Sequence, residues 1–405
     1  MRSGGTSAHL PRRGAEMRDL GVVAHGYVHI EGSRIVDVAA GEPSRAQRAG
    51  AEIVDARGCV VLPGFVDCHT HACWAGERWD EWEQKLAGAS YLELLSAGGG
   101  ILSTVRAVRA ATEASLAAGL DARTRQMAAY GTTTVEVKSG YGLDFENEVK
   151  MLAAIHATAA ESPLRLIPTF LAAHAIDPEC SAFVDRTIDD TIPAVLRKFP
   201  RLTVDAYCEN GSWSVRECER CFGRAIEYGS AIRVHTDQFT SLGMIPVALA
   251  LAARSVDHLE AATDHDLDLV AKSSTIAVGL PATAFCLSTP MLRARRFIDA
   301  GGALALATNA NPGSAPVRSM PIVISLAVRE MGLTPAEALT TVTMNAACVL
   351  GIAPECGSIE SGKSADLVLW PFDDERALGY ELSGALPTRV WARGVELPFD
   401  TLRAR

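Results

Sequence analysis

Ten histidines occur in this chain of 405 residues, and five of them stand where a short apolar run gives way to polar residues. His69 and His71 lie two apart in "PGFVDCHTH", so on an extended strand both imidazoles point to the same face. Two neutral imidazoles side by side are good ligands for zinc or iron(II), although each alone could be a hydrogen-bonded core histidine. Three further apolar runs are followed by His174, His235 and His258.

A different polar residue follows the run "LALAT" in "LALATNANPGSAP". Asn309 is the first polar side chain there, and a buried strand end is a favoured place for a catalytic group. An amide is a poor base, so Asn309 is either part of a turn or a residue with a special role. Cys73 has the same strand parity as His69 and His71, which makes it either a small core residue or a thiol that faces the same site.

Short apolar runs are the elements that would position these residues, and there are eight of them. Because the runs are apolar on both faces and alternate with amphipathic segments, they predict a parallel sheet with helical crossovers. One such helix is expected over 146–161, with Val149, Leu152, Ala153, Ile155 and His156 on its buried face. The expected strands are 59–67, 132–137, 164–170, 202–207, 231–235, 255–259, 275–280 and 303–308.

Eight consecutive strand–helix units favour a closed (β/α)8 barrel, a TIM barrel, over residues 65–351, with an open doubly wound sheet as the alternative. In a barrel all strand carboxyl ends open at one mouth, so the five histidines are expected to converge there. The chain ends, 1–64 and 352–405, contain short alternating strands with glycine-centred turns, including a hairpin that turns at Gly32-Ser33. They are expected to combine into a small β-sandwich beside the barrel.

The composition restricts the partners. With 38 basic and 48 acidic residues the net charge is −10, which argues against nucleic acid as a partner. No apolar run is long enough for a membrane span, and the N-terminus lacks the apolar core of a signal peptide. The 10 cysteines follow no framework spacing, so they are expected to be reduced thiols of a cytoplasmic protein.

Several longer motifs resemble a known family. "PGFVDCHTH" and "GSIESGKSADLVLW" are similar to the amidohydrolase superfamily of metal-dependent hydrolases. "AGGGI", "KSGYGL", "TFLAAHA", "HTDQ", "DHLE" and "NPGSAP" resemble, in order and spacing, its imidazolonepropionase family. That resemblance covers roughly residues 20–400 and implies hydrolysis of 4-imidazolone-5-propionate to N-formimino-L-glutamate, a step of histidine degradation.

The resemblance also implies roles for individual residues. It implies one divalent metal ion, zinc rather than iron, a small heterocyclic carboxylate as substrate, and a homodimer. Metal ligands would be His69, His71, His235 and the residue at 309. Catalytic groups would be His258, Gln238 and Asn309. Substrate contacts would be Arg78, Tyr91, Tyr141, His174, Asn311, Gly313 and Ser314.

The expected mechanism is metal-assisted hydrolysis. The ion makes hydroxide available at neutral pH, and hydroxide adds to the ring carbonyl carbon. A donor such as His258 stabilises the oxyanion, and the departing ring nitrogen takes up a proton.

One residue departs from the family. Where the family has a metal-binding, proton-accepting aspartate, this chain has Asn309, which carries no charge and accepts no proton at neutral pH. Three interpretations follow: an imidazolonepropionase trapped by an Asp→Asn substitution, a divergent hydrolase of a hydantoin or 2-thiohydantoin propionate, and a weakly catalytic protein that binds such a metabolite. In the second, Cys73 would lie near the ring sulfur.

Overall fold

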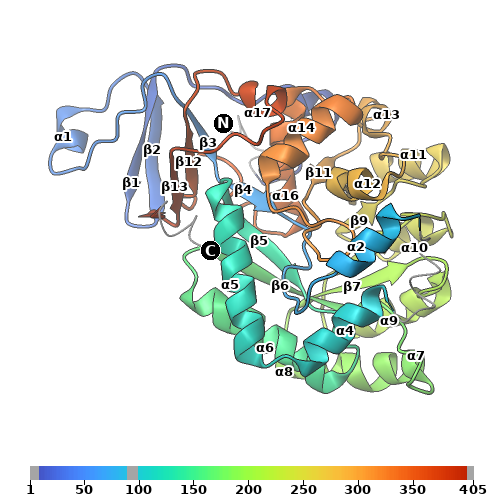
Figure 1. Ribbon diagram of the computed structural model, residues 1–405. Helices are drawn as coiled ribbons and strands as arrows, with labels where there is room; N and C mark the ends of the chain where they lie inside the picture. Colours follow the sequence, from blue (N-terminus) through green and yellow to red (C-terminus); the bar gives the residue numbers. More distant parts are fainter. Residues whose placement is uncertain (1–8, 89–98, 399–405) are drawn as a thin grey trace.

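The computed structural model describes residues 9–88 and 99–398, and its largest sheet is a parallel barrel (Figure 1). Its eight strands follow one another in chain order from β4 to β11, and each pair of neighbours is parallel. This order confirms the expected (β/α)8 barrel and excludes the doubly wound sheet, whose strand order would reverse. The strands are β4 (Phe65–Asp67), β5 (Thr132–Lys138), β6 (Arg165–Ala173), β7 (Thr203–Cys208), β8 (Ile232–Thr236), β9 (Ser255–His258), β10 (Ile276–Gly279) and β11 (Leu304–Leu306).

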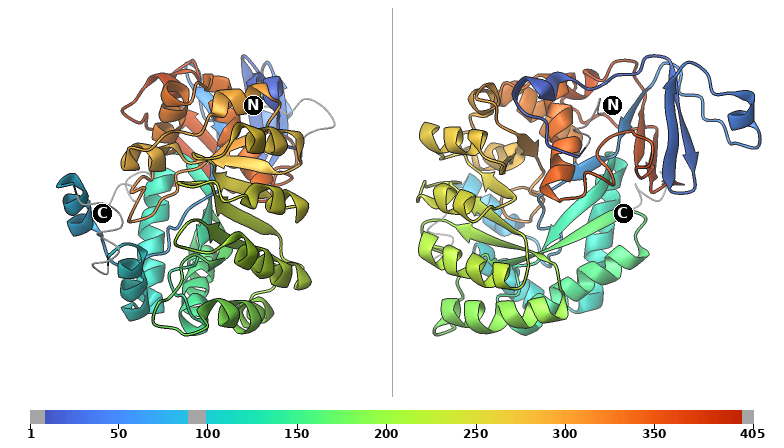
Figure 2. Two further views of the ribbon diagram at one scale, coloured as in Figure 1. Left: turned by 90° about the vertical axis from the view of Figure 1, so that its right-hand side faces the viewer. Right: turned by 180° about the vertical axis from the view of Figure 1, so that it is seen from behind.

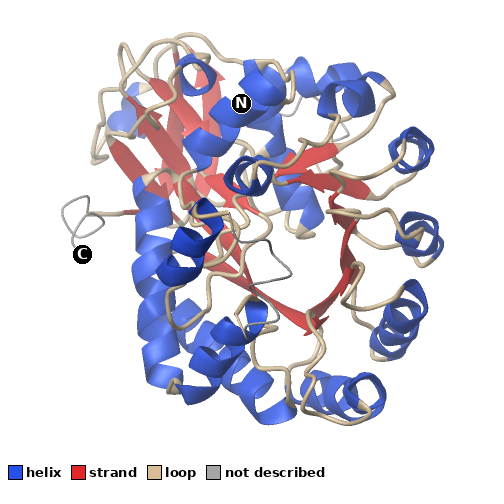
Figure 3. Ribbon diagram, turned by 45° about the vertical axis from the view of Figure 1, so that its right-hand side comes forward, coloured by secondary structure: helices blue, strands red, loops and turns tan. Residues whose placement is uncertain are grey.

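The barrel is closed by backbone hydrogen bonds between the residues that follow its first strand, β4, and those that follow its last strand, β11. The backbone N–H of Asn309 donates to the carbonyl of His69, and the N–H of His71 donates to the carbonyl of Ala310, both at 3.0 Å. We call this pair of contacts the seam. Figure 3 shows the strands as a ring with helices outside it. Three of the four residues that close the barrel, His69, His71 and Asn309, are therefore themselves candidate site residues.

Helices cover the outside of the barrel, and several begin at polar N-cap residues. The side chains of Thr112 and Asp144 accept the free backbone N–H groups of α5 and α6, and Ser214 forms a capping box with Glu217 in α9. The helices are η1 (Gly14–Arg18), α1 (Arg45–Arg48), α2 (Trp79–Leu86), α4 (Ile101–Ala110), α5 (Glu113–Ala129), α6 (Phe145–Glu161), α7 (Phe183–Arg186), η2 (Thr187–Thr191), α8 (Ile192–Lys198), α9 (Val215–Glu227), α10 (Met244–Ala250), α11 (Asp264–Lys272), α12 (Pro281–Leu287), α13 (Ala294–Asp299), α14 (Met320–Glu330), α15 (Pro335–Thr341), α16 (Met344–Val349) and α17 (Ala377–Tyr380). In the described part of the chain, no helix is long and apolar enough to cross a bilayer.

Helix α6 lies where expected, but its buried face is rotated from the predicted one. Leu152 and Ile155 are buried as predicted, whereas His156 is exposed and stacks on Phe199 with ring centroids 5.2 Å apart. The apolar pattern predicted the wrong face because it places charged residues outside, whereas the Glu148 carboxylate is buried. Its oxygens accept the backbone N–H groups of the loop after β5, including Gly140 at 2.9 Å.

The two chain ends share one antiparallel sheet, as predicted. Its order is β14-β13-β12-β3, and a hairpin of β1 and β2 lies beside it (Figure 2). The strands are β1 (Gly26–Glu31), β2 (Arg34–Ala40), β3 (Val60–Pro63), β12 (Leu367–Trp370), β13 (Arg389–Ala392) and β14 (Val395–Glu396). The predicted limits of the two parts, after residues 64 and 351, stay a prediction.

Gly64 connects this sheet to the barrel. The expected strand 59–67 is two strands, and the chain passes from β3 to β4 at Gly64. A Cβ atom there would lie 2.1 Å from the Thr133 hydroxyl oxygen, so only glycine fits without a shift. Directly after it, Phe65 packs on Trp370 of β12 with ring centroids 5.7 Å apart. This packing fixes the antiparallel sheet against the first barrel strand.

Candidate metal centre and active site

Three histidines meet at the carboxyl ends of β4 and β8. His69 and His71 follow β4, His235 lies in β8, and one nitrogen of each lies within 4.8 Å of the others. All three are buried, and burial lowers the pKa of His69 and His71 well below that of a free imidazole. Neutral imidazoles keep a lone pair for a metal ion. Among the His, Cys, Asp and Glu residues of the described ranges, these three are the single cluster with such geometry.

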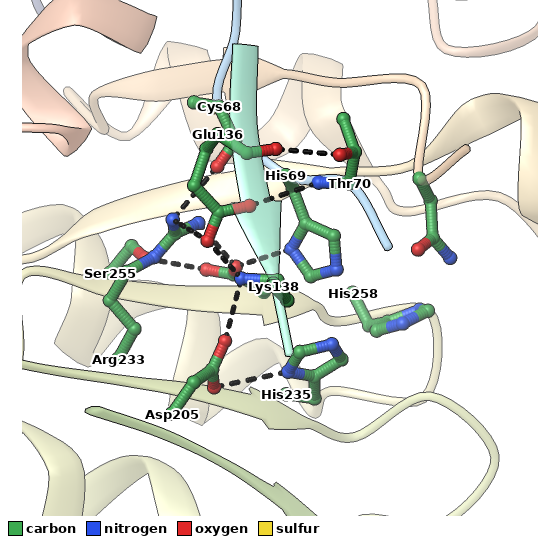
Figure 4. Close-up of polar contacts among 12 residues, drawn as sticks. Cys68, His69, Thr70, Glu136, Lys138, Asp205, Arg233, His235, Ser255 and His258 are labelled. Atoms are coloured by element: carbon green, nitrogen blue, oxygen red, sulfur yellow. Dashed lines mark hydrogen bonds and ion pairs between the residues drawn. The ribbon is translucent and has the colours of Figure 1, made fainter. Parts of the chain in front are cut away.

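Two buried carboxylates determine which nitrogen of each ring is available. The Nδ1 of His69 lies 2.6 Å from Asp257, and the Nδ1 of His235 lies 3.1 Å from Asp205 (Figure 4). A carboxylate only accepts, so each Nδ1 carries the proton and each Nε2 keeps its lone pair.

The free nitrogens fit a divalent ion. The Nε2 of His69 is buried and has no hydrogen-bond partner. The Nε2 atoms of His71 and His235 are 3.3 Å apart. Two nitrogens bound at about 2.0–2.1 Å to a tetrahedral ion are separated by about 3.3 Å. The three side chains therefore have the geometry that a divalent metal ion requires.

Asn309 lies on the seam beside these histidines. Its backbone has φ +52°, in the left-handed region that asparagine and aspartate tolerate best among residues with a side chain. Its Nδ2 donates to the hydroxyl oxygen of Thr283 at 2.9 Å, and its buried Oδ1 has no partner. Thr283 thus fixes the orientation of the amide and leaves the carbonyl oxygen as an open acceptor.

His258 is adjacent to the three-histidine cluster. Its ring centroid is 5.6 Å from that of His235 and 6.0 Å from that of His69. Its Nδ1 lies 3.3 Å from the nearly buried carboxylate of Glu260, so its Nε2 is the nitrogen left for other groups. Gln238 is partly exposed, and its Oε1 accepts a hydrogen bond from the Tyr207 hydroxyl at 2.9 Å.

Two of the expected substrate contacts form a wall beside His71. His174 stacks on His71 with centroids 5.0 Å apart, and its Nδ1 lies 2.9 Å from the carbonyl of Gly140. Tyr141 is buried next to both rings, 5.1 Å from His174, and burial raises the pKa of its hydroxyl. Tyr141 lies in the loop after β5, whose backbone N–H groups donate to the carboxylate of Glu148.

Arg78 is oriented by a neighbouring acid. Its Nε and Nη2 both donate to one carboxylate oxygen of Glu81, at 2.9 and 2.6 Å. The remaining nitrogen, Nη1, lies against Gly313, where a Cβ atom would be 2.1 Å away. Gly313 therefore makes room for the guanidinium.

The turn after Asn309 is held by its own side chains. The Oδ1 of Asn311 accepts the backbone N–H groups of Gly313 and Ser314 at 2.8 Å, and its Nδ2 donates to the carbonyl of Asn309 at 2.7 Å. Asn311 thus shapes the turn in addition to any contact with a ligand. Tyr91 lies outside the described residues.

Cys73 is packed in the apolar core with Ala72 and Trp74. Burial raises the pKa of its thiol to about 12, so it is neutral at physiological pH. It does not belong to the three-histidine cluster. The structure gives it the environment of a small core residue.

Sequence reasoning missed the charged residues beneath the histidines. The sequence did contain a signal, because these charged residues lie inside the apolar runs. A strand that is buried on both faces rarely carries a charged residue unless another charge pairs with it. These residues are Glu136, Lys138, Asp205, Arg233 and Asp257, all buried. Glu260 and Thr283, which orient His258 and Asn309, were missed because nothing in their local sequence marks them.

The comparisons with known proteins agree with this geometry. A sequence model of the amidohydrolase family matches residues 60–395. The imidazolonepropionase of Chloroflexus aggregans is 44% identical over 398 residues, which are 95% of this chain and 93% of that protein. The imidazolonepropionase of Symbiobacterium thermophilum is 43% identical over 96% of this chain and 94% of its own length.

Solved structures share the fold. E. coli guanine deaminase superposes with a TM-score of 0.70 at 14% identity, covering 93% of this chain and 92% of that one. A guanine deaminase from C. acetobutylicum gives a TM-score of 0.68 at 15% identity, with 93% and 95% covered.

Proposed function

The chain belongs to the amidohydrolase family and, with its imidazolonepropionase relatives, is a hydrolase of C–N bonds in a cyclic amide; on this premise we propose that the three-histidine centre carries out that hydrolysis on an imidazolone ring with a propionate arm. One observation supports it most. Three neutral imidazoles, two of them held by buried carboxylates, direct free nitrogens to a common point at the barrel mouth. We place the attacking water and the ring carbonyl at this point.

Zinc is the ion we assign to the site. Three imidazole nitrogens and a fourth, exchangeable position are a frequent zinc environment in hydrolases. When bound, the ion supplies positive charge that polarises the carbonyl and acidifies water. Every other step is assigned to side chains of the chain itself.

His258 is the group we assign to proton transfer. Its Nδ1 is held by Glu260, so Nε2 takes the proton released as the C–O bond forms and returns it to the ring nitrogen as the C–N bond breaks. Gln238 holds a water or ring group through its amide, which Tyr207 orients. Asn309 contributes its open carbonyl oxygen as a neutral ligand.

Arg78 is the group we assign to the propionate. Glu81 occupies its Nε edge, which leaves the Nη1 side beside Gly313 for the substrate carboxylate. His174 and Tyr141 would hold the ring against His71, and the turn 311–314 would enclose the far end.

The substrate test compares three rings that carry the same propionate arm. We expect 4-imidazolone-5-propionate to be hydrolysed, and the corresponding hydantoin and 2-thiohydantoin to have kcat/KM values lower by about 100-fold or more. The hydantoin, thiohydantoin and metabolite-binding alternatives are not favoured by the relatives, which are imidazolonepropionases over almost the whole chain. Faster turnover of the thiohydantoin, or no turnover at all, would contradict the proposal.

Replacing Arg78 tests the assigned contact with the carboxylate. Arg78→Met is expected to raise KM about 100-fold, since a charge-assisted hydrogen bond to a carboxylate contributes about 1.5–3 kcal/mol. Because the contact is the same in substrate and transition state, kcat should change little. Steady-state kinetics measures both. An analogue whose arm ends in a carboxamide is the control: an equal loss on that analogue would show that Arg78 only supports the loop.

A cytoplasmic homodimer is part of the proposal: the family resemblance implies the dimer, and the cysteine pattern the location. Sedimentation equilibrium of the purified protein tests the dimer.

A further inference from the structure

A chain of alternating charges runs beneath the metal centre, inside the barrel. It connects His69 to His235 through five fully buried side chains from β5, β7, β8 and β9. Figure 4 shows Lys138 between Glu136 and Asp205. In order the groups are His69, Asp257, Arg233, Glu136, Lys138, Asp205 and His235.

The links in this chain are short. Asp257 lies 2.6 Å from both His69 and Arg233. Lys138 lies 2.7 Å from Glu136 and 2.7 Å from Asp205. The longest contacts are those of Arg233 with Glu136, at 3.3 Å, and of Asp205 with His235, at 3.1 Å. The carboxylates also accept hydrogen bonds from outside the chain of charges. The Ser255 hydroxyl donates to Asp257 at 2.6 Å, and the backbone N–H of Thr70 donates to Glu136 at 3.0 Å.

The alternation has a consequence for charge. Three carboxylates and two cations leave one net negative charge in the buried layer. Because the outermost charged groups are Asp257 and Asp205, the groups that contact His69 and His235 are both anionic. Lys138 and Arg233 each contact two acids and no ligand histidine.

We propose that Asp205 and Asp257 are positioning residues that supply, through His235 and His69, the negative charge that the ligand set of this chain lacks. The inference rests on the metal centre of the proposed function. His69, His71, His235 and Asn309 are all neutral donors, so a divalent ion finds no counter-charge among its direct ligands. In a buried site of low dielectric, the nearest carboxylates contribute strongly to holding the ion.

The fixed tautomers are the second part of the same role. Each carboxylate keeps the proton on Nδ1 and so presents Nε2 to the ion. His71 has no such partner, since its Nδ1 is buried without a hydrogen bond. The charge therefore reaches the centre through two of the three histidines.

The test measures zinc affinity, with zinc chloride as the probe and a chromophoric chelator as competitor. Asp257→Asn and Asp205→Asn are each expected to raise the zinc Kd about 10–100-fold while circular dichroism shows an unchanged fold. The two ends are tested separately, so failure of one variant to fold leaves the other to decide. Unchanged Kd values in the folded variants would overturn the inference.

Lys138→Gln is the matched control, because it changes the same chain with the opposite sign of charge. The glutamine side chain is uncharged and one bond shorter, so the layer loses a positive charge while both acids remain, and zinc should bind at least as tightly as in the natural chain. If Lys138→Gln weakens zinc as much as Asp205→Asn, the chain has only a structural role and the inference fails. Failure of the natural chain itself to bind zinc would instead contradict the metal centre of the proposed function.

Discussion

The Asn309→Asp variant is expected to bind zinc about 100-fold more tightly than the natural chain and to hydrolyse the imidazolone at least about tenfold faster at neutral pH. The new carboxylate would add a full negative charge beside an ion held by neutral ligands, and it would accept the proton of the attacking water. Chelator competition and steady-state kinetics measure the two effects. The fold should tolerate the change, because aspartate adopts the same left-handed backbone and the Thr283 hydroxyl can donate to it.

Asn309→Gly is the control for this variant. Glycine accepts a φ of +52° without strain but removes the carbonyl oxygen. Zinc affinity should fall below that of the natural chain if that oxygen is a ligand. An aspartate variant that binds zinc no better than the natural chain would show that position 309 does not face the ion. Tighter zinc with no gain in rate would show that the proton already has an efficient acceptor, such as His258.

The His71→Leu variant is expected to lose bound zinc and at least on the order of 10⁴-fold in kcat. Leucine fills a similar volume without a donor atom, so one of three imidazole ligands is removed and two nitrogens remain. Elemental analysis of the purified variant measures the metal, and kinetics the rate.

His69→Leu separates metal loss from instability. It removes a ligand in the same way, but it also removes the N–H that Asp257 accepts at 2.6 Å. With chelator present, His69→Leu should therefore be less stable to denaturant than His71→Leu by about 1–3 kcal/mol. Equal metal content in His71→Leu and the natural chain would refute the three-histidine centre.

The barrel could be predicted from the sequence because each strand is apolar on both faces. Runs such as 132–137 and 303–308 have this pattern, and the structure has strands at all eight expected places. The expected strand 59–67 is the exception, because the chain passes at Gly64 from the antiparallel sheet to the barrel. The convergence of the histidines followed from their position at strand ends, because parallel strands of a barrel share one mouth.

Partners across the barrel could not be predicted. Lys138 meets Asp205 from a strand two positions away, and Arg233 meets Asp257 from the adjacent strand. Such pairs depend on the closed barrel, not on local spacing. The same limit explains His156, whose expected burial depended on which face of α6 carries Glu148.

Because of the seam between β4 and β11, the centre is complete only when the barrel is closed. His69 and Asn309 come from the first and the final barrel strands, and their backbones meet only when the ring is complete. A nascent chain or a fragment that ends before β11 therefore holds the histidines but not the finished centre. We expect an ion held by His69 and Asn309, as proposed, to link the first and last strands, so its removal should loosen their junction before any other part of the barrel.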